Sequence, residues 1–196
     1  MEKFVNSVGA YLQDKKALQE DDIDVFTYGL DLVIFSIVSI LGLLVLGFVV
    51  GHFLETVFYL LAFTPLQTTG GGYHAKTHLR CFLITLAGWL AAMILCHILP
   101  LWIIALFMLQ GILTVFKYAP IEHVNAPMSP RQRRKMRRYA RTICVAMFVC
   151  VCTAYTFGST LLIPVAAGIG MYGISANVAY RMKTNTRNKA LHYDIE

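Results

Sequence analysis

Three long apolar stretches dominate the chain, and every basic residue lies outside them. They cover residues 32–66, 82–116 and 142–180, and the only charged residue within them is Glu55. Each stretch is 35 to 39 residues long, whereas one membrane-spanning helix needs roughly 20 residues. Each stretch is therefore long enough for two spans.

A turn is predicted near the middle of each stretch. The residues that favour it are Gly51 and His52 in the first stretch, Pro100 in the second, and residues 158–164 in the third. The pattern predicts three helical hairpins, and so an all-α integral membrane protein with about six transmembrane helices. Residues 54–66 form the shortest of these segments, and a re-entrant or tilted helix is the alternative there.

The first 29 residues follow a different pattern from the rest. One face of a helix through residues 4–12 is apolar, and it carries Phe4, Val5, Val8, Tyr11 and Leu12. Such a face is typical of an amphipathic helix that lies in the membrane interface. Residues 19–24 are mostly acidic and are expected to form a connector, and the segment lacks the apolar core of a signal peptide. We expect residues 1–29 to form an interfacial segment within one membrane-embedded domain of residues 1–196.

The charge pattern supports the membrane assignment and orients it. Only 14% of the residues are charged, compared with about 25% in soluble globular proteins. All 17 Lys and Arg lie in the N-terminal segment, in loops predicted at residues 67–81 and 117–141, and in the tail 181–196. Because basic residues favour the cytoplasmic side, we expect both loops and both termini to face the cytoplasm. Basic residues in the cytoplasmic loops and their contacts with anionic membrane lipids then account for the net charge of +6, so no nucleic-acid partner is expected.

Five cysteines are present, and four of them lie inside the apolar stretches: Cys96, Cys144, Cys150 and Cys152. Cysteine in such surroundings behaves as a small hydrophobic residue, and a disulfide framework is not expected in a reducing cytoplasm. The paired Cys and His spacing of zinc sites is absent from the sequence, so neither a metal site nor a cofactor is predicted. Only Cys81 lies at a boundary between polar and apolar sequence.

A short polar segment leads up to Cys81. It begins with three glycines, Gly70 to Gly72, and contains His74 and His78. A thiolate with a nearby base is sufficient for covalent acyl transfer. The glycines would allow a tight turn and leave backbone N–H groups facing a developing oxyanion. The structural alternative is a Gly-rich turn between two helices, with a buried cysteine.

The base that partners Cys81 depends on where the next helix begins. If Thr77 caps that helix, Cys81 lies about one turn inside it, where the positive end of the helix dipole favours a thiolate. His74 would then lie on a preceding loop that can fold back toward the sulfur. His78 would lie three residues before Cys81, on the same helix face. Spacing alone leaves both histidines open.

Two sequence elements resemble the accessory gene regulator B (AgrB) family of membrane cysteine endopeptidases. The elements are Gly71-Gly72-Tyr73-His74-Ala75 followed by Cys81, and Tyr118-Ala119-Pro120-Ile121-Glu122 followed by Asn125 and Pro127. The size, the hydropathy, the basic central region and the order of the elements also match. The resemblance covers essentially the whole chain.

The resemblance implies that His74 is the base and Cys81 the nucleophile. The substrate would be a short precursor peptide made in the cytoplasm. Cys81 would attack a peptide bond near its C-terminal tail and release the tail. The thioester would then pass to a Cys or Ser side chain of the precursor and close a thiolactone or lactone ring. Such cyclic peptides serve as quorum-sensing autoinducers in Gram-positive bacteria.

Two positions depart from the family pattern. Gln67 stands about where many relatives carry an Arg, and Glu122 stands where they often carry an Asp. If that Arg contacts an acidic peptide tail, Lys76 or Arg80 would replace it here. The candidates for peptide binding are Gln67, Lys76, Arg80, Glu122 and Asn125. Three of these are also candidates for orienting His74, namely Gln67, Glu122 and Asn125.

Two other classes of function compete with a peptidase. One is a small transporter or peptide exporter without chemistry, although a chain with Glu55 as its only charged residue within the apolar stretches is poor in coupling groups. The other is a membrane scaffold. The basic run 131–138 is typical of a topology determinant, and a docking site for an acidic peptide region is its functional alternative. A homodimer formed through apolar faces is a further hypothesis.

Overall fold

The computed structural model describes residues 20–73, 77–122 and 128–193. The described residues form helices joined by short connections, and no strand occurs among them. In chain order the helices are α2 (Glu20–Val49), α3 (Phe53–Gly70), α4 (His78–Ile98), α5 (Leu101–Tyr118), α6 (Pro130–Thr156) and α7 (Ile163–Tyr193). The predicted all-α fold is confirmed.

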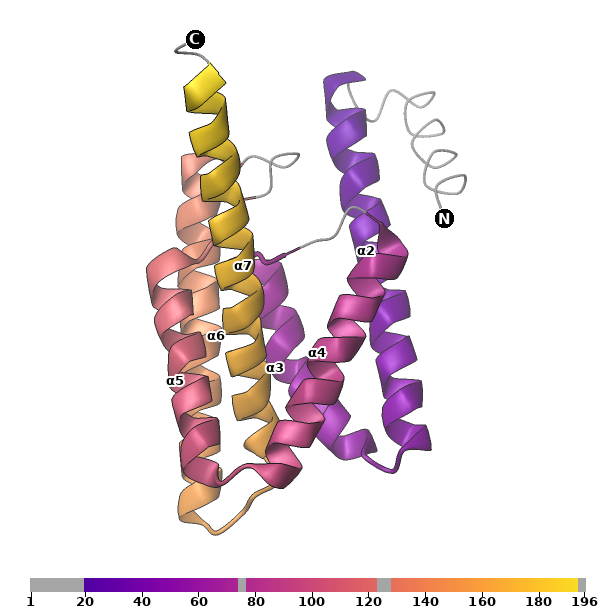
Figure 1. Ribbon diagram of the computed structural model, residues 1–196, viewed down its shortest axis with the longest axis vertical. Helices are drawn as coiled ribbons and strands as arrows, with labels where there is room; N and C mark the ends of the chain where they lie inside the picture. Colours follow the sequence, from indigo (N-terminus) through magenta and orange to yellow (C-terminus); the bar gives the residue numbers. More distant parts are fainter. Residues whose placement is uncertain (1–19, 74–76, 123–127, 194–196) are drawn as a thin grey trace.

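The helices follow one another as α2–α3, α4–α5 and α6–α7, and the turn within each pair lies where the apolar pattern predicts it. Helices α4 and α5 diverge from their turn and pack mainly against other helices (Figure 1). The turns occupy residues 50–52, 99–100 and 157–162. Gly51 and Gly158 have backbone φ angles of 80° and 73°, in the left-handed region that glycine adopts without strain. All three turns lie at one end of the bundle, and the α3–α4 connection lies toward the other (Figure 1).

Among the described residues, four helices are long and apolar enough to cross a membrane: α2 from Gly29 to Val49, and the whole of α4, α5 and α6. Many of their large apolar side chains are exposed, as a lipid environment requires. Helix α7 is less apolar, and it packs against α3, α4, α5 and α6. A helix enclosed by others can carry polar residues more readily than one that faces lipid. The chain is thus a multi-pass all-α membrane protein, while the number of six spans stays a prediction.

Small residues let α7 approach its neighbours closely. A Cβ at Gly111 of α5 would overlap the carbonyl oxygen of Ile169, and a Cβ at Gly173 would lie 2.6 Å from the Cα of Gly111. On the side of α3, a Cβ at Gly168 would lie 2.8 Å from the carbonyl oxygen of Tyr59. Helices within membranes associate through such close backbone contacts. The two crossings hold α7 against both α3 and α5.

Both ends of the described chain are more helical than the sequence analysis expects. Residues 20–29, assigned there to the interfacial segment, form the first turns of α2. The tail from residue 181 continues α7 as far as Tyr193. Extending an existing helix into polar sequence is easier than nucleating a new one. The amphipathic helix predicted before residue 20 lies outside the described residues.

The two loops predicted between the hairpins are shorter than expected. Helix α3 ends at Gly70 and α4 begins at His78, so the connection contracts from 67–81 to 71–77. The basic run 131–138 lies on α6 and not in a loop. Both differences arise because polar residues extended the helices beyond the apolar stretches.

A capping box starts α6 immediately before its basic residues. The Oγ of Ser129 accepts a hydrogen bond from the backbone N–H of Gln132 at 3.3 Å, and the Gln132 Oε1 accepts one from the Ser129 N–H at 3.0 Å. Pro130 occupies the first helical position, where its missing N–H costs nothing. Arg and Lys are good helix formers, so the basic run continues the helix that this cap starts.

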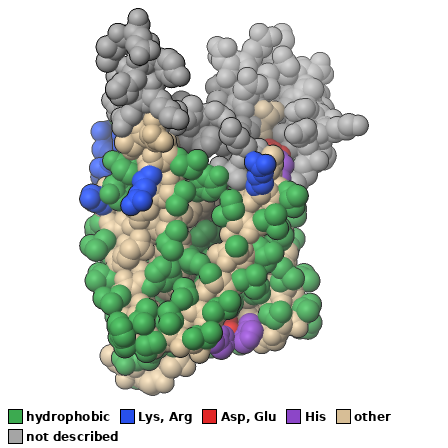
Figure 2. Space-filling view, viewed as in Figure 1, with side chains coloured by type: hydrophobic (Ala, Val, Ile, Leu, Met, Phe, Trp, Pro, Cys, Tyr) green, Lys and Arg blue, Asp and Glu red, His purple; other side chains and the backbone are tan. Residues whose placement is uncertain are grey.

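Lys and Arg side chains gather near the end of the bundle that carries the connections between hairpins. Figure 2 shows them above a broad hydrophobic band, with His and acidic side chains at the opposite end. Basic residues concentrated on one side are the pattern of a protein oriented by its cytoplasmic charges. That the basic end faces the cytoplasm stays a prediction.

Candidate functional site

The glycines that precede Cys81 form a tight junction between α3 and residues 118–122. Gly71 has a φ angle of 69°, and a Cβ there would collide with the carbonyl oxygen of Ile121. The backbone N–H of Ile121 donates to the carbonyl oxygen of Gly70 at 2.9 Å. Gly71 thus adopts a conformation that favours glycine, but residues 71–73 form no turn. The two sequence elements that carry the family resemblance are therefore in contact.

Tyr73 is held by side chains from two helices. Its backbone N–H donates to the Oγ of Ser175 on α7 at 3.2 Å, and that hydroxyl donates to the Oε1 of Gln67 on α3 at 3.4 Å. The Nε2 of Gln67 donates to the carbonyl oxygen of Tyr73 at 3.5 Å, a weak bond. Sequence reasoning selected Gln67 and missed Ser175, whose only signal was a hydroxyl within an apolar stretch.

Cys81 lies in the first turn of α4, as the sequence predicts. Thr77 caps the helix, because its Oγ1 accepts from the N–H of Arg80 at 3.4 Å and its carbonyl oxygen from the N–H of Cys81 at 3.0 Å. The carbonyl oxygen of Cys81 accepts from the hydroxyl of Thr85 at 2.9 Å. No acidic residue occurs in this turn. The positive end of the helix dipole therefore meets no carboxylate from α4 itself, whereas the Asp31 carboxylate of α2 pairs with His78 in the same turn.

A cavity of about 510 Å³ opens beside Cys81, between α2, α3, α4 and α7. Its volume lies within the range of ligand pockets in proteins, about 300–1,000 Å³. Gln67, Tyr73 and Ser175 line the cavity together with Cys81. The lining is otherwise mostly apolar and includes Phe35, Leu43, Leu60, Phe63, Ile84 and Met171. The cavity is therefore mostly apolar, and its polar side carries the hydrogen-bonded group of Gln67, Tyr73 and Ser175.

The two candidate bases differ in what the structure describes. His74 lies outside the described residues. His78 packs against α2, where its Nε2 lies 3.1 Å from the Oδ2 of Asp31 and its ring centroid 5.0 Å from that of Phe35. Asp31 was not selected from the sequence, since it resembles any charge that precedes an apolar stretch. The geometry thus gives His78 an acidic partner and leaves the choice of base open.

The other two described candidates for peptide binding, Arg80 and Glu122, do not line the cavity. Lys76 and Asn125 lie outside the described residues. Arg80 is exposed on α4 and does not line the cavity. Glu122 forms ion pairs with Arg133 at 3.4 Å and with Lys183 at 3.7 Å. Glu122 therefore ties the region after α5 to α6 and α7, and of the three candidates that the structure describes only Gln67 lines the cavity with Cys81.

The five cysteines, all of them described, form no disulfide with one another. Cys144 is buried in the core formed with α7, and Cys150 and Cys152 are exposed on the apolar part of α6. Cys81 alone among the five lines the cavity. Location thus separates this thiol from the others.

Comparison with known proteins agrees with the two elements in the sequence. The family model described as accessory gene regulator B matches residues 2–177. An AgrB-like protein of Clostridium perfringens (strain 13 / Type A) is 24% identical over 131 residues, which cover 66% of this chain and 70% of that protein. No solved structure matches the chain.

Proposed function

The chain belongs to the accessory gene regulator B family, and from that premise we propose that it is a membrane cysteine endopeptidase acting on an autoinducing-peptide precursor. Membership of this family supports a role in autoinducing-peptide processing. The observation that carries the endopeptidase chemistry is the location of Cys81, in the first turn of α4 and in the wall of a cavity of about 510 Å³.

The N-terminus of α4 suits a nucleophilic thiolate. A negative charge in the first turn of a helix is stabilised by the aligned backbone dipoles, and such positions favour the thiolate form of cysteine. The same dipoles would stabilise the negative charge that develops on a carbonyl oxygen under attack. The apolar walls of the cavity would limit the access of water, which competes for the acyl group.

We propose His74 as the general base and acid. Its neighbour Tyr73 lines the same cavity as Cys81 and is bonded to Ser175 and Gln67, while Thr77 is fixed as the cap of α4. His74 thus belongs to a short connection that is anchored on both sides. A base on such a connection can approach the sulfur from outside the helix and can also reach a leaving nitrogen.

The reaction would proceed in two acyl transfers. The Cys81 thiolate adds to the carbonyl carbon of the scissile bond, and the C–N bond breaks as His74 gives a proton to the leaving amine. A thioester then links the precursor to Cys81. A Cys or Ser side chain of the precursor attacks this thioester, a base takes its proton, and the ring closes as the Cys81 thiolate leaves. Attack by the precursor conserves the acyl bond that hydrolysis would lose.

Purified full-length protein in liposomes, given its cognate precursor, tests this function. Cys81→Ala and Cys81→Ser should abolish release of the C-terminal fragment, and mass spectrometry of the wild type should find the acyl adduct on Cys81. Cys150→Ala, which removes an exposed thiol of α6, is the matched control and should cleave normally. Normal cleavage by Cys81→Ala, or an adduct on another cysteine, contradicts the proposal.

We further propose that the cavity opens to the cytoplasm, where the precursor is made. The support is the concentration of Lys and Arg at the Cys81 end of the bundle (Figure 2). The exposed basic residues 131–138 on α6 would attract an acidic region of the peptide. A membrane-impermeant thiol reagent should label Cys81 in inverted vesicles and not in intact cells, and the reverse result would refute this orientation.

A further inference from the structure

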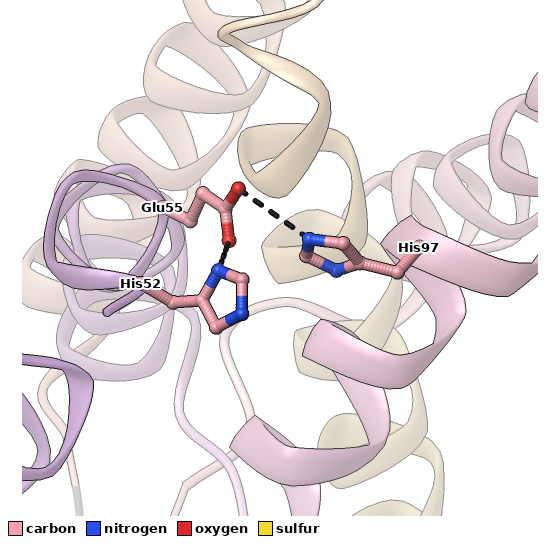
Figure 3. Close-up of side chains that lie close together, drawn as sticks. All are labelled: His52, Glu55 and His97. Atoms are coloured by element: carbon pink, nitrogen blue, oxygen red, sulfur yellow. Dashed lines mark ion pairs between the residues drawn. The ribbon is translucent and has the colours of Figure 1, made fainter. Parts of the chain in front are cut away.

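A second group of titratable side chains lies at the end of the bundle that carries the turns at residues 50–52, 99–100 and 157–162. We call it the hairpin-turn end. His52 and Glu55 come from the start of α3, and His97 comes from the last turn of α4 (Figure 3). One ligand atom of each side chain lies within 4.8 Å of the others. The sequence places His97 more than forty positions after the other two, so spacing could not reveal the group.

The three side chains converge on the carboxylate of Glu55. The Nδ1 of His52 lies 2.6 Å from its Oε2, and the Nε2 of His97 lies 3.6 Å from its Oε1. The two imidazole rings meet edge to face, with centroids 4.7 Å apart. The Oε2 atom is enclosed, yet it has no hydrogen-bond partner among the described residues. The His52 nitrogen is thus close enough for a hydrogen bond but is not aligned for one.

His97 is oriented as metal-binding histidines are. Its Nδ1 lies 2.8 Å from the carbonyl oxygen of Met93, and because a carbonyl only accepts, this nitrogen carries the hydrogen. In the neutral form of the ring with the hydrogen on Nδ1, the Nε2 that faces Glu55 presents its lone pair. Metal-ligating histidines commonly donate their second N–H to a backbone carbonyl in this way.

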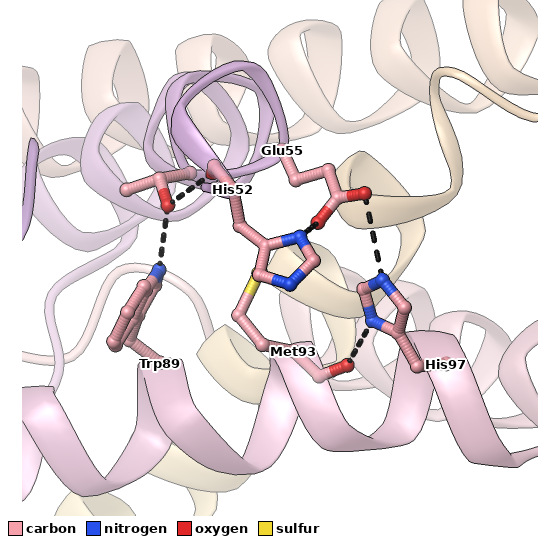
Figure 4. Close-up of polar contacts among 6 residues, drawn as sticks. His52, Glu55, Trp89, Met93 and His97 are labelled. Carbon is pink, nitrogen blue, oxygen red and sulfur yellow. Dashed lines mark hydrogen bonds and ion pairs between the residues drawn. The ribbon is translucent and has the colours of Figure 1, made fainter. Parts of the chain in front are cut away.

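A buried hydrogen-bond network fixes the helix ends that carry the group (Figure 4). The carbonyl oxygen of His52 accepts from the hydroxyl of Thr56 at 2.8 Å, and that hydroxyl accepts from the Nε1 of Trp89 at 3.1 Å. Thr56 and Trp89 are almost fully buried. The start of α3 is thus bonded to the middle of α4, and the group is held by a rigid frame.

We propose that His52, Glu55 and His97 bind one divalent transition-metal ion of the zinc class. Two imidazoles and one carboxylate suit zinc and its neighbours, whereas calcium and magnesium prefer oxygen ligands. Ligand atoms bonded to zinc at about 2.0–2.1 Å in a tetrahedron are about 3.3 Å apart. His52 lies 2.6 Å from one oxygen of Glu55 and His97 lies 3.6 Å from the other, and one ligand atom of each residue lies within 4.8 Å of the others, so side-chain rotations would bring the three atoms to that spacing. The side chains are 40%, 33% and 46% exposed, which leaves room for a water as fourth ligand.

The ion would clamp the start of α3 to the end of α4. It would lie at the opposite end of the bundle from Cys81, so the site does not depend on the peptidase function. The three residues also lie beside the turns, where an ion can enter from the adjoining solvent. The orientation proposed above would make that solvent the cell exterior.

The test uses full-length, untagged Cys81→Ala protein in detergent, stripped with a chelator, so that the nucleophile cannot bind the metal. Equilibrium dialysis against Zn²⁺ should give one ion per chain at saturation. His52→Gln, Glu55→Gln and His97→Gln should each weaken binding about 100-fold, since even the loss of a residue that only supports a ligand costs 10–100-fold. His78→Gln is the matched control, because His78 is a similarly exposed histidine paired with a carboxylate, and it should keep the affinity.

Two measurements keep the proposal refutable if a variant unfolds. Circular dichroism with size-exclusion chromatography identifies such variants. X-ray absorption on the Zn²⁺-loaded Cys81→Ala protein should show nitrogen and oxygen neighbours with the scattering pattern of two imidazoles. Sulfur neighbours, no stoichiometric binding, or equal binding by folded variants of all three residues would overturn the site.

Discussion

The two ends of the bundle both gather histidines and carboxylates, but these side chains have different surroundings. At the Cys81 end, side chains from α2, α3, α4 and α7 surround a cavity of about 510 Å³, and two of the polar ones, Gln67 and Ser175, bond to the backbone of Tyr73. At the hairpin-turn end, His52, Glu55 and His97 face one another at contact distance. A cavity can admit a peptide, whereas convergent ligand atoms can hold only an ion or a proton. Residue type alone therefore says little about function until the surrounding volume is known.

The largest expected effect is on cleavage, and it should differ between substitutions of His74 and His78. His74→Ala should reduce cleavage by roughly 10²–10⁴-fold, the usual contribution of a general acid–base group. His78→Ala should retain most activity, because its imidazole pairs with Asp31 of α2. Single-turnover cleavage with purified protein measures both.

An inactive His78→Ala beside an active His74→Ala would reverse this assignment. In that case Asp31→Asn should also lose activity, since Asp31 would then orient the base. Under our assignment Asp31→Asn changes cleavage little.

A smaller effect is expected from glycines at the two ends. Gly71→Ala should destabilise the protein by about 1–3 kcal/mol through its backbone conformation alone, and further because the new Cβ would strike the carbonyl oxygen of Ile121. Gly51→Ala is the matched control: it has a φ angle of 80° and no atom within 4 Å of the new Cβ. It should cost about 1–2 kcal/mol and leave cleavage intact. Thermal unfolding with cleavage assays compares them, and equal losses of activity would argue against the packed junction at Gly71.

Ser175→Ala tests the hydrogen bonds that join Ser175 to Tyr73 and Gln67 beside the cavity. It removes the acceptor for the Tyr73 N–H and the donor to Gln67, and we expect kcat to fall about 10-fold because small misplacements of catalytic groups are costly. Ser39→Ala is the control, since Ser39 lines the same cavity and its hydroxyl has no hydrogen-bond partner among the described residues. Steady-state kinetics should show a change in kcat for the first and none for the second. Identical kinetics would mean that Ser175 does not position the connection.

The smallest effect is expected from Glu122→Gln. The ion pairs of Glu122 involve Arg133 and Lys183, whose side chains are about half exposed, and such pairs contribute about 0–1 kcal/mol. Stability should fall by less than about 1 kcal/mol, with cleavage nearly unchanged. Denaturant unfolding and a cleavage assay measure the two quantities. Complete loss of cleavage would restore Glu122 as a group that orients the base.

Much of the fold was predictable from the sequence because its determinants are local. Stretches without Lys or Arg predicted three pairs of helices, and Gly51, Pro100 and the glycine at 158 marked the turns that the structure confirms. Thr77 and Cys81 lie where capping rules put them. The bounds of α2, α3, α6 and α7 were predicted less well, because helices continue into polar sequence once the apolar part has nucleated them.

The site was only partly predictable, because its contacts join distant parts of the chain. Sequence alone selected Cys81 as the candidate nucleophile and predicted its helix and the two candidate bases. Only the tertiary structure brought Ser175 to Tyr73 across 102 positions, Asp31 to His78, and His97 to Glu55. The physical reason is that close crossings of small residues, such as Gly111 against Gly173, set the helix register. Which polar side chains meet is therefore a property of packing between helices and not of any local pattern.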